Sequence, residues 1–273
     1  AAAEKPEEIT DRRQEFVLTA PADENSWHAG RAGLQYRDLI PDRLGGRFIA
    51  SHIRHARGGE IPDYVHYHRV RFQMIYCLAG WARVVYENQG APFVMRAGDC
   101  VLQPPEIRHR VFESSAGFEV LEIGSPAVHE TFADHQLPLP NEAAAASGRI
   151  FGGGQNFVFH IADGAVWNAA PTVKGLEARD TGISAATGGL ADVRVFCTVQ
   201  SAKFSVRHSG EFLFFYVLKG SPRLCKDEGE IHLQLKMGAS FVLPAGEEYF
   251  IEAGGDTEML CVSSPAGSIS IFS

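Results

Sequence analysis

The stretch HYHRVRFQMIYCLAG, residues 66–80, contains two histidines one residue apart, then a glutamine, and it ends in a glycine. Side chains alternate between the two faces of a strand, so His66 and His68 project from one face with their Cβ atoms about 7 Å apart. Two imidazoles at that spacing can hold one ion. The apolar run that follows predicts a strand that ends in a tight turn at Ala79-Gly80.

Gln73 lies an odd number of positions after His68, so it would face the other side of one continuous strand. A turn or bulge within residues 69–72 removes this contradiction, because the chain can then re-enter the sheet in a new register. Further along, the prolines of QPPEIRH end one strand and place His109 at the start of the next. A third imidazole is therefore expected near the first two.

The chain also repeats itself at a nearly constant offset. Residues 14–40 resemble residues 155–182, RAGDCVLQPPE resembles KMGASFVLPAGE, and EVLEIGSPA resembles EMLCVSSPA. Chance similarity between short strands would not keep one order and spacing across separated blocks, so we interpret the pattern as an internal duplication. It predicts two domains, at residues 1–127 and 155–273, joined by a linker at 128–154 that is rich in Pro, Ala and Gly.

Each repeat consists of short stretches rich in Val, Ile, Phe and Tyr, bounded by glycines and prolines. Boundaries recur at intervals of roughly 8–12 residues, which is typical of a sandwich or barrel. A chain of 273 residues fits two domains of ordinary size. The predicted fold class is therefore all-β, with one small antiparallel barrel in each repeat.

Composition excludes several classes of function. The formal net charge is -8 and no run of five Lys or Arg residues occurs, so we expect no nucleic-acid partner. No apolar stretch reaches the roughly 18 residues of a membrane span, and the polar N-terminal segment does not resemble a signal peptide. The five cysteines are scattered singly, which is not a disulfide framework or a zinc ribbon. We expect a cytoplasmic protein without a membrane partner.

Two groups of residues resemble the signature motifs of the cupin superfamily, and the duplication makes the chain resemble a bicupin. The groups are Gly59, His66, His68, Gln73 and Gly80, followed by Gly98, Pro104 and His109. The sequence departs from the family pattern in two places, since Gly59 lies one residue too early and Glu106 replaces a glycine. The resemblance implies two tandem jelly-roll barrels and one divalent metal ion. Its ligands would be His66, His68, Gln73 and His109.

The second repeat has lost this ligand set. Its corresponding positions are Val206, His208, Leu213 and Tyr249, which leaves at most one strong ligand. We therefore expect no metal ion in the C-terminal barrel.

A glutamine ligand is neutral, so the ion keeps its full charge and favours an anionic, chelating substrate. Histidine and amide ligands suit Fe(II), Ni, Zn or Mn. The resemblance to bicupin dioxygenases favours Fe(II) and a small aromatic or dicarbonyl substrate. It also allows a homodimer.

Two other hypotheses stay open. The first is a non-oxidative, metal-dependent isomerase or lyase that acts on a sugar acid or a related carbonyl acid. It needs a general base, for which Tyr64 is a candidate because it shares the inward parity of His66. The second is a non-catalytic cupin that binds a metal or another ligand.

Strand parity also suggests residues that contact the substrate. Ile75 and Cys77 share the parity of Gln73, and Val111 shares that of His109. Cys77 also fits the role of a small buried filler. His52 lies on an upstream strand and is a further candidate. The remaining histidines are expected to be surface or structural residues, among them His28, His129, His135, His160 and His232.

Overall fold

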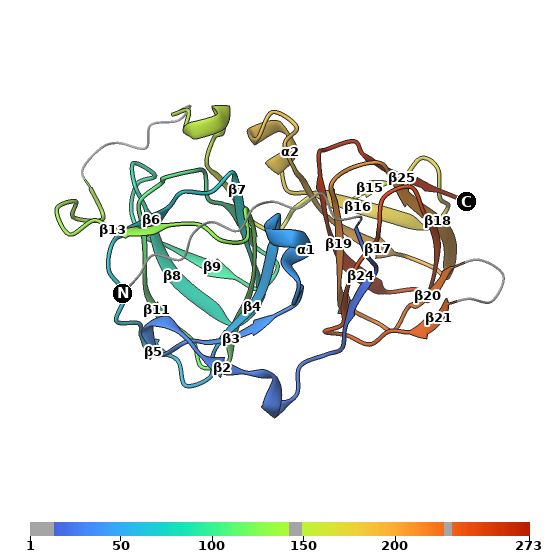
Figure 1. Cartoon of the computed structure of the whole chain (residues 1–273), viewed down its shortest axis with the longest axis horizontal. Coiled ribbons are helices and arrows are strands. Elements are labelled where there is room, and N and C mark those ends of the chain that lie inside the picture. The colour runs from blue at the N-terminus through green and yellow to red at the C-terminus, as the bar shows by residue number, and fades with distance from the viewer. Residues whose placement is uncertain (1–13, 142–148, 227–230) are drawn as a thin grey trace. The chain divides into compact units, whose positions relative to one another are not determined.

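The computed structural model describes residues 14–141, 149–226 and 231–273. The chain divides into two compact units (Figure 1). The first comprises residues 26–163, and the second comprises residues 164–273 together with residues 14–25. Each unit is built almost entirely of strands, and all strand pairs are antiparallel.

The first unit has two sheets, one with strand order β14-β10-β7-β12-β4-β3-β2 and one with order β13-β6-β11-β8-β9, in which β5 also pairs with β11. Its elements are β2 (His28–Ala29), η2 (Arg31–Gly33), β3 (Gln35–Asp38), α1 (Arg43–Gly46), β4 (Ile49–His55), β5 (Gly59–Glu60), β6 (His66–His68), β7 (Phe72–Ala79), β8 (Trp81–Tyr86), β9 (Phe93–Arg96), β10 (Cys100–Leu102), β11 (His109–Ser114), β12 (Phe118–Ser125), β13 (Thr131–Ala133), η3 (Gly152–Gly154) and β14 (Val158–His160).

The second unit repeats this arrangement, with sheets β1-β22-β19-β24-β17-β16-β15 and β21-β20-β23-β18-β25. Its elements are β1 (Val17–Thr19), η1 (Glu24–Ser26), β15 (Asn168–Ala169), β16 (Leu176–Asp180), α2 (Ile183–Ala186), β17 (Asp192–Thr198), β18 (Ala202–His208), β19 (Phe212–Lys219), β20 (Arg223–Lys226), β21 (Ile231–Gln234), β22 (Ser240–Val242), β23 (Glu248–Ala253), β24 (Thr257–Ser264) and β25 (Ile269–Phe272). The seven-stranded sheets match position by position, and the five-stranded sheet, read in reverse, matches the order β13-β6-β11-β8-β9. The all-β prediction of two tandem jelly-roll barrels is therefore confirmed.

The unit boundaries differ from those expected from the duplication. Strand β1 pairs with β22 and completes a sheet of the second unit, although the sequence places it in the first repeat. Strand β14 pairs with β10 and belongs to the first unit, although it follows the expected linker. Strand β13 lies inside that linker and pairs with β6. The cause is pairing between strands far apart in sequence, which no local pattern encodes. Residues 142–148 of the linker lie outside the described residues.

The chain crosses from one sheet to the other between β6 and β7, through residues 69–71. His68 therefore faces the interior from the six-stranded sheet, and Gln73 faces it from the seven-stranded sheet. This crossing resets the side-chain parity between the two residues. The turn after β7 needs a glycine, because Gly80 has a φ of +68° and an added Cβ would collide with Ser115.

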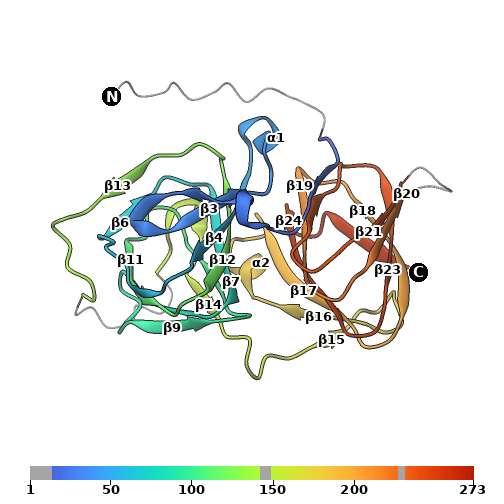
Figure 2. The ribbon, with the colours of Figure 1, turned by 90° about the horizontal axis from the view of Figure 1, so that it is seen from below.

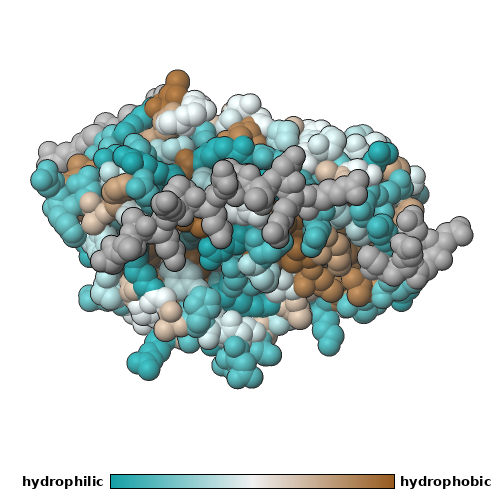
Figure 3. Space-filling model, in the orientation of Figure 1, coloured by the Kyte–Doolittle hydropathy of each residue, from teal (hydrophilic) through white to brown (hydrophobic). Residues whose placement is uncertain are grey.

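Apolar side chains pack between the two sheets of each unit, and these sheets enclose an interior (Figure 2). The second interior is densely apolar and includes Val206, Leu213, Phe215, Phe241 and Tyr249, each at most 1% exposed. Hydrophilic side chains prevail on the face in Figure 3, where hydrophobic ones form smaller patches. None of the helices in the described part of the chain has the length and apolar character that crossing a membrane would take.

Candidate metal centre

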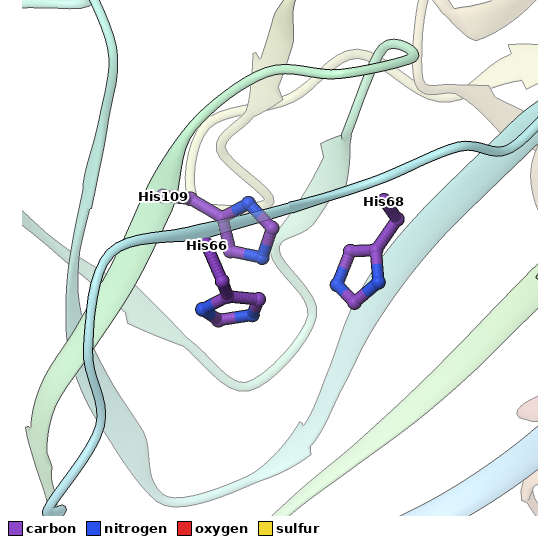
Figure 4. A group of neighbouring side chains, drawn as sticks. All are labelled: His66, His68 and His109. Atoms are coloured by element: carbon purple, nitrogen blue, oxygen red, sulfur yellow. The ribbon is translucent and has the colours of Figure 1, made fainter. Parts of the chain in front are cut away.

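Three histidines of the first unit converge on one point. His66 on β6 and His109 on β11 are register partners in adjacent strands, with ring centroids 4.2 Å apart. His68 projects from the same face of β6, and its ring lies 5.1 Å from that of His66 and 5.3 Å from that of His109. One ring nitrogen of each histidine lies within 4.8 Å of the others. Figure 4 shows the three rings around a common space.

Outward hydrogen bonds fix the orientation of all three imidazoles. Nδ1 of His66 donates to the carbonyl of Tyr64 at 2.8 Å, and Nδ1 of His109 donates to the carbonyl of Ile107 at 3.0 Å. Nδ1 of His68 lies 2.8 Å from the hydroxyl of Thr131. Since a carbonyl can only accept, Nε2 carries the lone pair in neutral His66 and His109. This is the arrangement in which a histidine offers Nε2 to a metal ion, with an outer partner holding the ring.

Burial favours the neutral form that a metal ligand requires. It lowers the pKa of His109 to about 4, against a smaller opposing effect of the bond to Ile107. Burial and the nearby His109 lower the pKa of His68 to about 2. The pKa of His66 is lowered as well, mainly by burial. All three residues therefore fit a divalent metal ion at neutral pH, because no proton has to leave.

Arg31, in the short helix η2 after β2, reaches into this group. Its Nη2 donates a 2.8 Å hydrogen bond to Nε2 of His66 and forms a 2.8 Å ion pair with Asp63. The guanidinium also lies 5.2 Å from the ring centroid of Tyr64. Asp63 is buried and accepts a further hydrogen bond from the backbone N–H of Val111. A positive group therefore stands directly beside a candidate ligand nitrogen.

The histidines line a cavity of about 360 Å³ inside the barrel. Its walls are mostly apolar, and Tyr36, Glu122 and His129 add polar groups. Burial raises the pKa of Tyr36 to about 12, so its phenol stays protonated at neutral pH. Apolar side chains that line the cavity include Leu34, Ile49, Ile53, Ile75, Val84 and Val111.

Gln73 is 1% exposed and lies on the inward side of β7. Its Nε2 donates a 3.0 Å hydrogen bond to Oε1 of Glu122 on the neighbouring strand β12. The nitrogen is thus engaged, and the amide oxygen is the atom of Gln73 that suits a cation. Its role as a fourth ligand stays a prediction.

Comparison with known proteins agrees with this architecture. Residues 52–124 match the cupin domain family. The chain is a bicupin. A comparison with curated protein sequences finds no significant match.

Solved structures with the same fold as this bicupin include a salicylate 1,2-dioxygenase from Pseudaminobacter salicylatoxidans, with a TM-score of 0.61, 14% identity, and coverage of 83% of this chain and 74% of that one. The same enzyme has also been solved as an adduct with gentisate. That structure aligns with a TM-score of 0.59, 14% identity, and coverage of 83% of this chain and 72% of that one. An oxalate decarboxylase from Lactobacillus farciminis, in a formate complex, aligns with a TM-score of 0.64, 14% identity, and coverage of 93% and 88%. At these identities the likeness shows the fold.

The other candidates from the sequence lie in different places in the bicupin. Ile75 and Val111 line the cavity. Cys77 is fully buried in the apolar cluster beneath it, and burial raises the pKa of its thiol to about 12. His52 faces the other side of β4, where it lies 2.7 Å from Glu119 and packs on Trp27. The side chain of Tyr64 is 41% exposed and is not among the described residues that line the cavity.

Several polar residues of the cavity were not found from the sequence. His129 was expected to be a surface or structural residue, but it lines the cavity and its ring lies 5.4 Å from that of His68. Arg31 lies in a short connection that belongs to neither cupin motif. The inward position of Glu122 could not be predicted from alternation, because its neighbours Leu121 and Ile123 on the other face of β12 are apolar and buried.

In the second unit the strand pairing identifies the corresponding positions. Val206 pairs with Tyr249 across β18 and β23, as His66 pairs with His109 across β6 and β11. Both Val206 and Tyr249 are packed in the apolar core. His208 is buried and its Nε2 donates to the carbonyl of Leu243 at 2.8 Å, so this imidazole is engaged by the backbone.

Proposed function

We propose that this bicupin is a metal-dependent dioxygenase of a small, anionic, chelating substrate, such as an aromatic hydroxy acid, a catechol or a dicarbonyl compound. His66, His68 and His109 would hold the ion, with Gln73 as a fourth ligand. The fold is shared with a salicylate 1,2-dioxygenase, and this likeness supports the choice of an aromatic acid as the first substrate class to test.

One observation carries the proposal. Three neutral imidazoles, each with Nδ1 held from outside, meet at the wall of a mainly apolar cavity. A structural metal site is usually closed by four protein ligands that leave no space for a substrate. Here the three histidines border a cavity large enough for a small molecule, as catalysis at a metal ion requires.

The residues of the chain would bind and shield the substrate. Arg31 provides the positive charge for its acidic group, since the guanidinium already lies at His66 and is oriented by the buried carboxylate of Asp63. The apolar walls exclude water from the body of the substrate. An Fe(II) ion in this site would supply the redox chemistry that lets dioxygen react with an organic molecule. Ni, Zn and Mn also suit these ligands.

A second candidate function is a non-oxidative isomerase or lyase, and Glu122 is the observation that favours it. Proton abstraction beside a carbonyl needs a base inside the cavity. Glu122 lines the cavity, whereas Tyr64 is not among the described residues that do so. Burial raises the pKa of Glu122, which moves a carboxylate toward the range of a useful general base. Under this alternative Glu122, and not Tyr64, would take the proton.

Oxygen uptake distinguishes the two functions. The protein is purified anaerobically, loaded with Fe(II), and mixed with oxygen and a panel of hydroxybenzoates, catechols and 1,3-diketones. A dioxygenase consumes one O₂ per product formed, and Zn-loaded protein and a His68→Ala variant consume none. Absence of uptake across the whole panel argues against the dioxygenase. Turnover of unsaturated uronates without oxygen, supported by Ni, Zn or Mn and lost in Glu122→Gln, supports the isomerase or lyase.

A further inference from the structure

Glu122 is a carboxylate in an otherwise mostly apolar part of the cavity wall. Its register partners are Ile75 on β7 and Ser51 on β4, and both also line the cavity. Ile49 and Val120 contribute further apolar surface beside it. A carboxylate in such surroundings loses much of its hydration, so a ligand that offers it a hydrogen bond gains more than it would in water.

The protein satisfies only part of the hydrogen-bonding capacity of the Glu122 carboxylate. Oε1 accepts the hydrogen bond from Gln73, which is the one hydrogen-bond partner of Glu122 among the described residues. An ionised carboxylate can accept about four hydrogen bonds. Oε2 is therefore left for a donor that enters the cavity.

Arg31 gives the same cavity an opposite charge. Its guanidinium lies at the histidine group, and its charge acts on Glu122 within the shared cavity. A ligand that complements both residues has an acidic group for Arg31 and the metal centre, an apolar body, and a hydroxyl or amino group for Glu122. A plain carboxylic acid satisfies Arg31 and leaves Oε2 of Glu122 without a hydrogen-bond donor, while Oε1 keeps its bond from Gln73.

We propose that Glu122 is a specificity-determining residue, which selects acids that carry a second, hydrogen-bond-donating group over acids that lack one. The substrate class is thereby narrowed to hydroxy or amino acids with an apolar body, of which hydroxybenzoates are the simplest aromatic members. This proposal rests on the proposed function insofar as the acidic group binds at the metal centre. An acid without a donor group binds more weakly, because it leaves Oε2 of Glu122 unpaired inside the cavity.

The test compares three probes in the metal-loaded protein without oxygen: benzoate, 3-hydroxybenzoate and 4-hydroxybenzoate. In both hydroxybenzoates the hydroxyl is too far from the carboxylate to share one metal ion with it, so chelation does not imitate the effect of Glu122. Affinities are measured by titration calorimetry for the parent protein and for Glu122→Gln, Glu122→Asp and Glu119→Gln. Glu119 lies on the same strand but bonds to His52 on the other face, so it is the matched control.

We expect the parent protein and Glu119→Gln to bind at least one hydroxybenzoate about tenfold or more tightly than benzoate, as a hydrogen bond to a charged group allows. In Glu122→Gln this ratio falls to within about threefold, and Glu122→Asp recovers part of it. Metal content is measured in each variant, and the ratio removes any common effect of a changed metal affinity. An unchanged ratio in Glu122→Gln, no preference in the parent, or no binding of any probe overturns the proposal. Selective binding without oxygen uptake on any substrate contradicts the dioxygenase and leaves the role of Glu122 intact.

Discussion

The amide of Gln73 donates a 3.0 Å hydrogen bond to the carboxylate of Glu122 across β7 and β12. This contact explains why a glutamine occupies a position at which a carboxylate would also suit a metal ion. A glutamate at position 73 would put two acidic groups at hydrogen-bond distance, where one of them has to take up a proton. A glutamine is neutral, donates to Glu122 and keeps an amide oxygen for a cation.

Replacement of Gln73 by Glu is therefore expected to destabilise the metal-free protein. The variant exchanges a hydrogen bond to a carboxylate for repulsion between two buried acids, at a cost of about 2 kcal/mol at pH 8. Urea unfolding of the chelator-treated protein measures this loss. A double variant, Gln73→Glu combined with Glu122→Gln, again has one hydrogen-bond donor and one acceptor at this contact. It should therefore recover most of the stability. A single variant as stable as the parent contradicts this account.

Removal of the Arg31 side chain is expected to separate anion binding from metal binding. Arg31→Ala loses a charge-assisted interaction, so benzoate should bind roughly ten- to a hundredfold more weakly to the metal-loaded protein. Metal affinity should not fall, because Nη2 of Arg31 no longer competes for Nε2 of His66. Calorimetry with benzoate and competition with a chelator measure the two effects.

Arg54→Ala is the control for Arg31, since Arg54 packs on Trp27, bonds to Gln35 and does not line the cavity. It should leave both affinities unchanged. A loss of metal in Arg31→Ala, or an unchanged affinity for benzoate, would show that the guanidinium does not act as the anion site.

His109→Ala is expected to abolish metal binding. The variant removes one of three converging ligands and leaves the partner of its Nδ1, the carbonyl of Ile107, without that bond. The parent should hold one ion per chain by elemental analysis, and the variant less than about one tenth of that. Thermal unfolding gives a second readout, because metal at a hundred times its Kd stabilises the folded parent by about 2.7 kcal/mol.

His232→Ala, in the second unit, should keep both the metal and the stabilisation, since His232 is exposed and bonds to Cys225. Two ions per chain in the parent would contradict the prediction that the C-terminal barrel binds none. Full occupancy in His109→Ala would contradict the assignment of the first site.

The three histidines that the structure brings together share a local signal in the sequence. His66 and His68 are two positions apart, and the prolines before His109 mark the start of a strand, so short-range rules bring the three together. The repeated strand pattern was enough for the two barrels. The position of Gln73 was ambiguous because the chain changes sheets after β6, and only the pairing of β7 with β12 shows its direction.

Long-range pairing and double-sided burial account for what the sequence did not reveal. Arg31 reaches His66 from a connection 35 positions upstream, a distance at which no periodicity operates. Glu122 lies in β12, which is buried on both faces, so alternation gives no hint of its direction. The strands β1 and β14 are too short for local patterns to say which barrel they complete.

The stability of the protein is expected to depend on pH through His208. Burial is the main cause that lowers its pKa in the folded state, against the opposing effect of its hydrogen bond to Leu243. The unfolded chain therefore binds more protons than the folded protein below about pH 6.5, and the free energy of unfolding falls as the pH falls through that range. One such histidine contributes a slope of up to about 1.4 kcal/mol per pH unit.

His208→Gln has no group to protonate there, so its urea midpoints between pH 7.5 and 5 should decline less steeply than those of the parent, both treated with chelator. The variant's lower stability at pH 7.5, from the altered bond to Leu243, does not affect this comparison of slopes. Equal slopes would show that His208 is protonated to the same extent in both states.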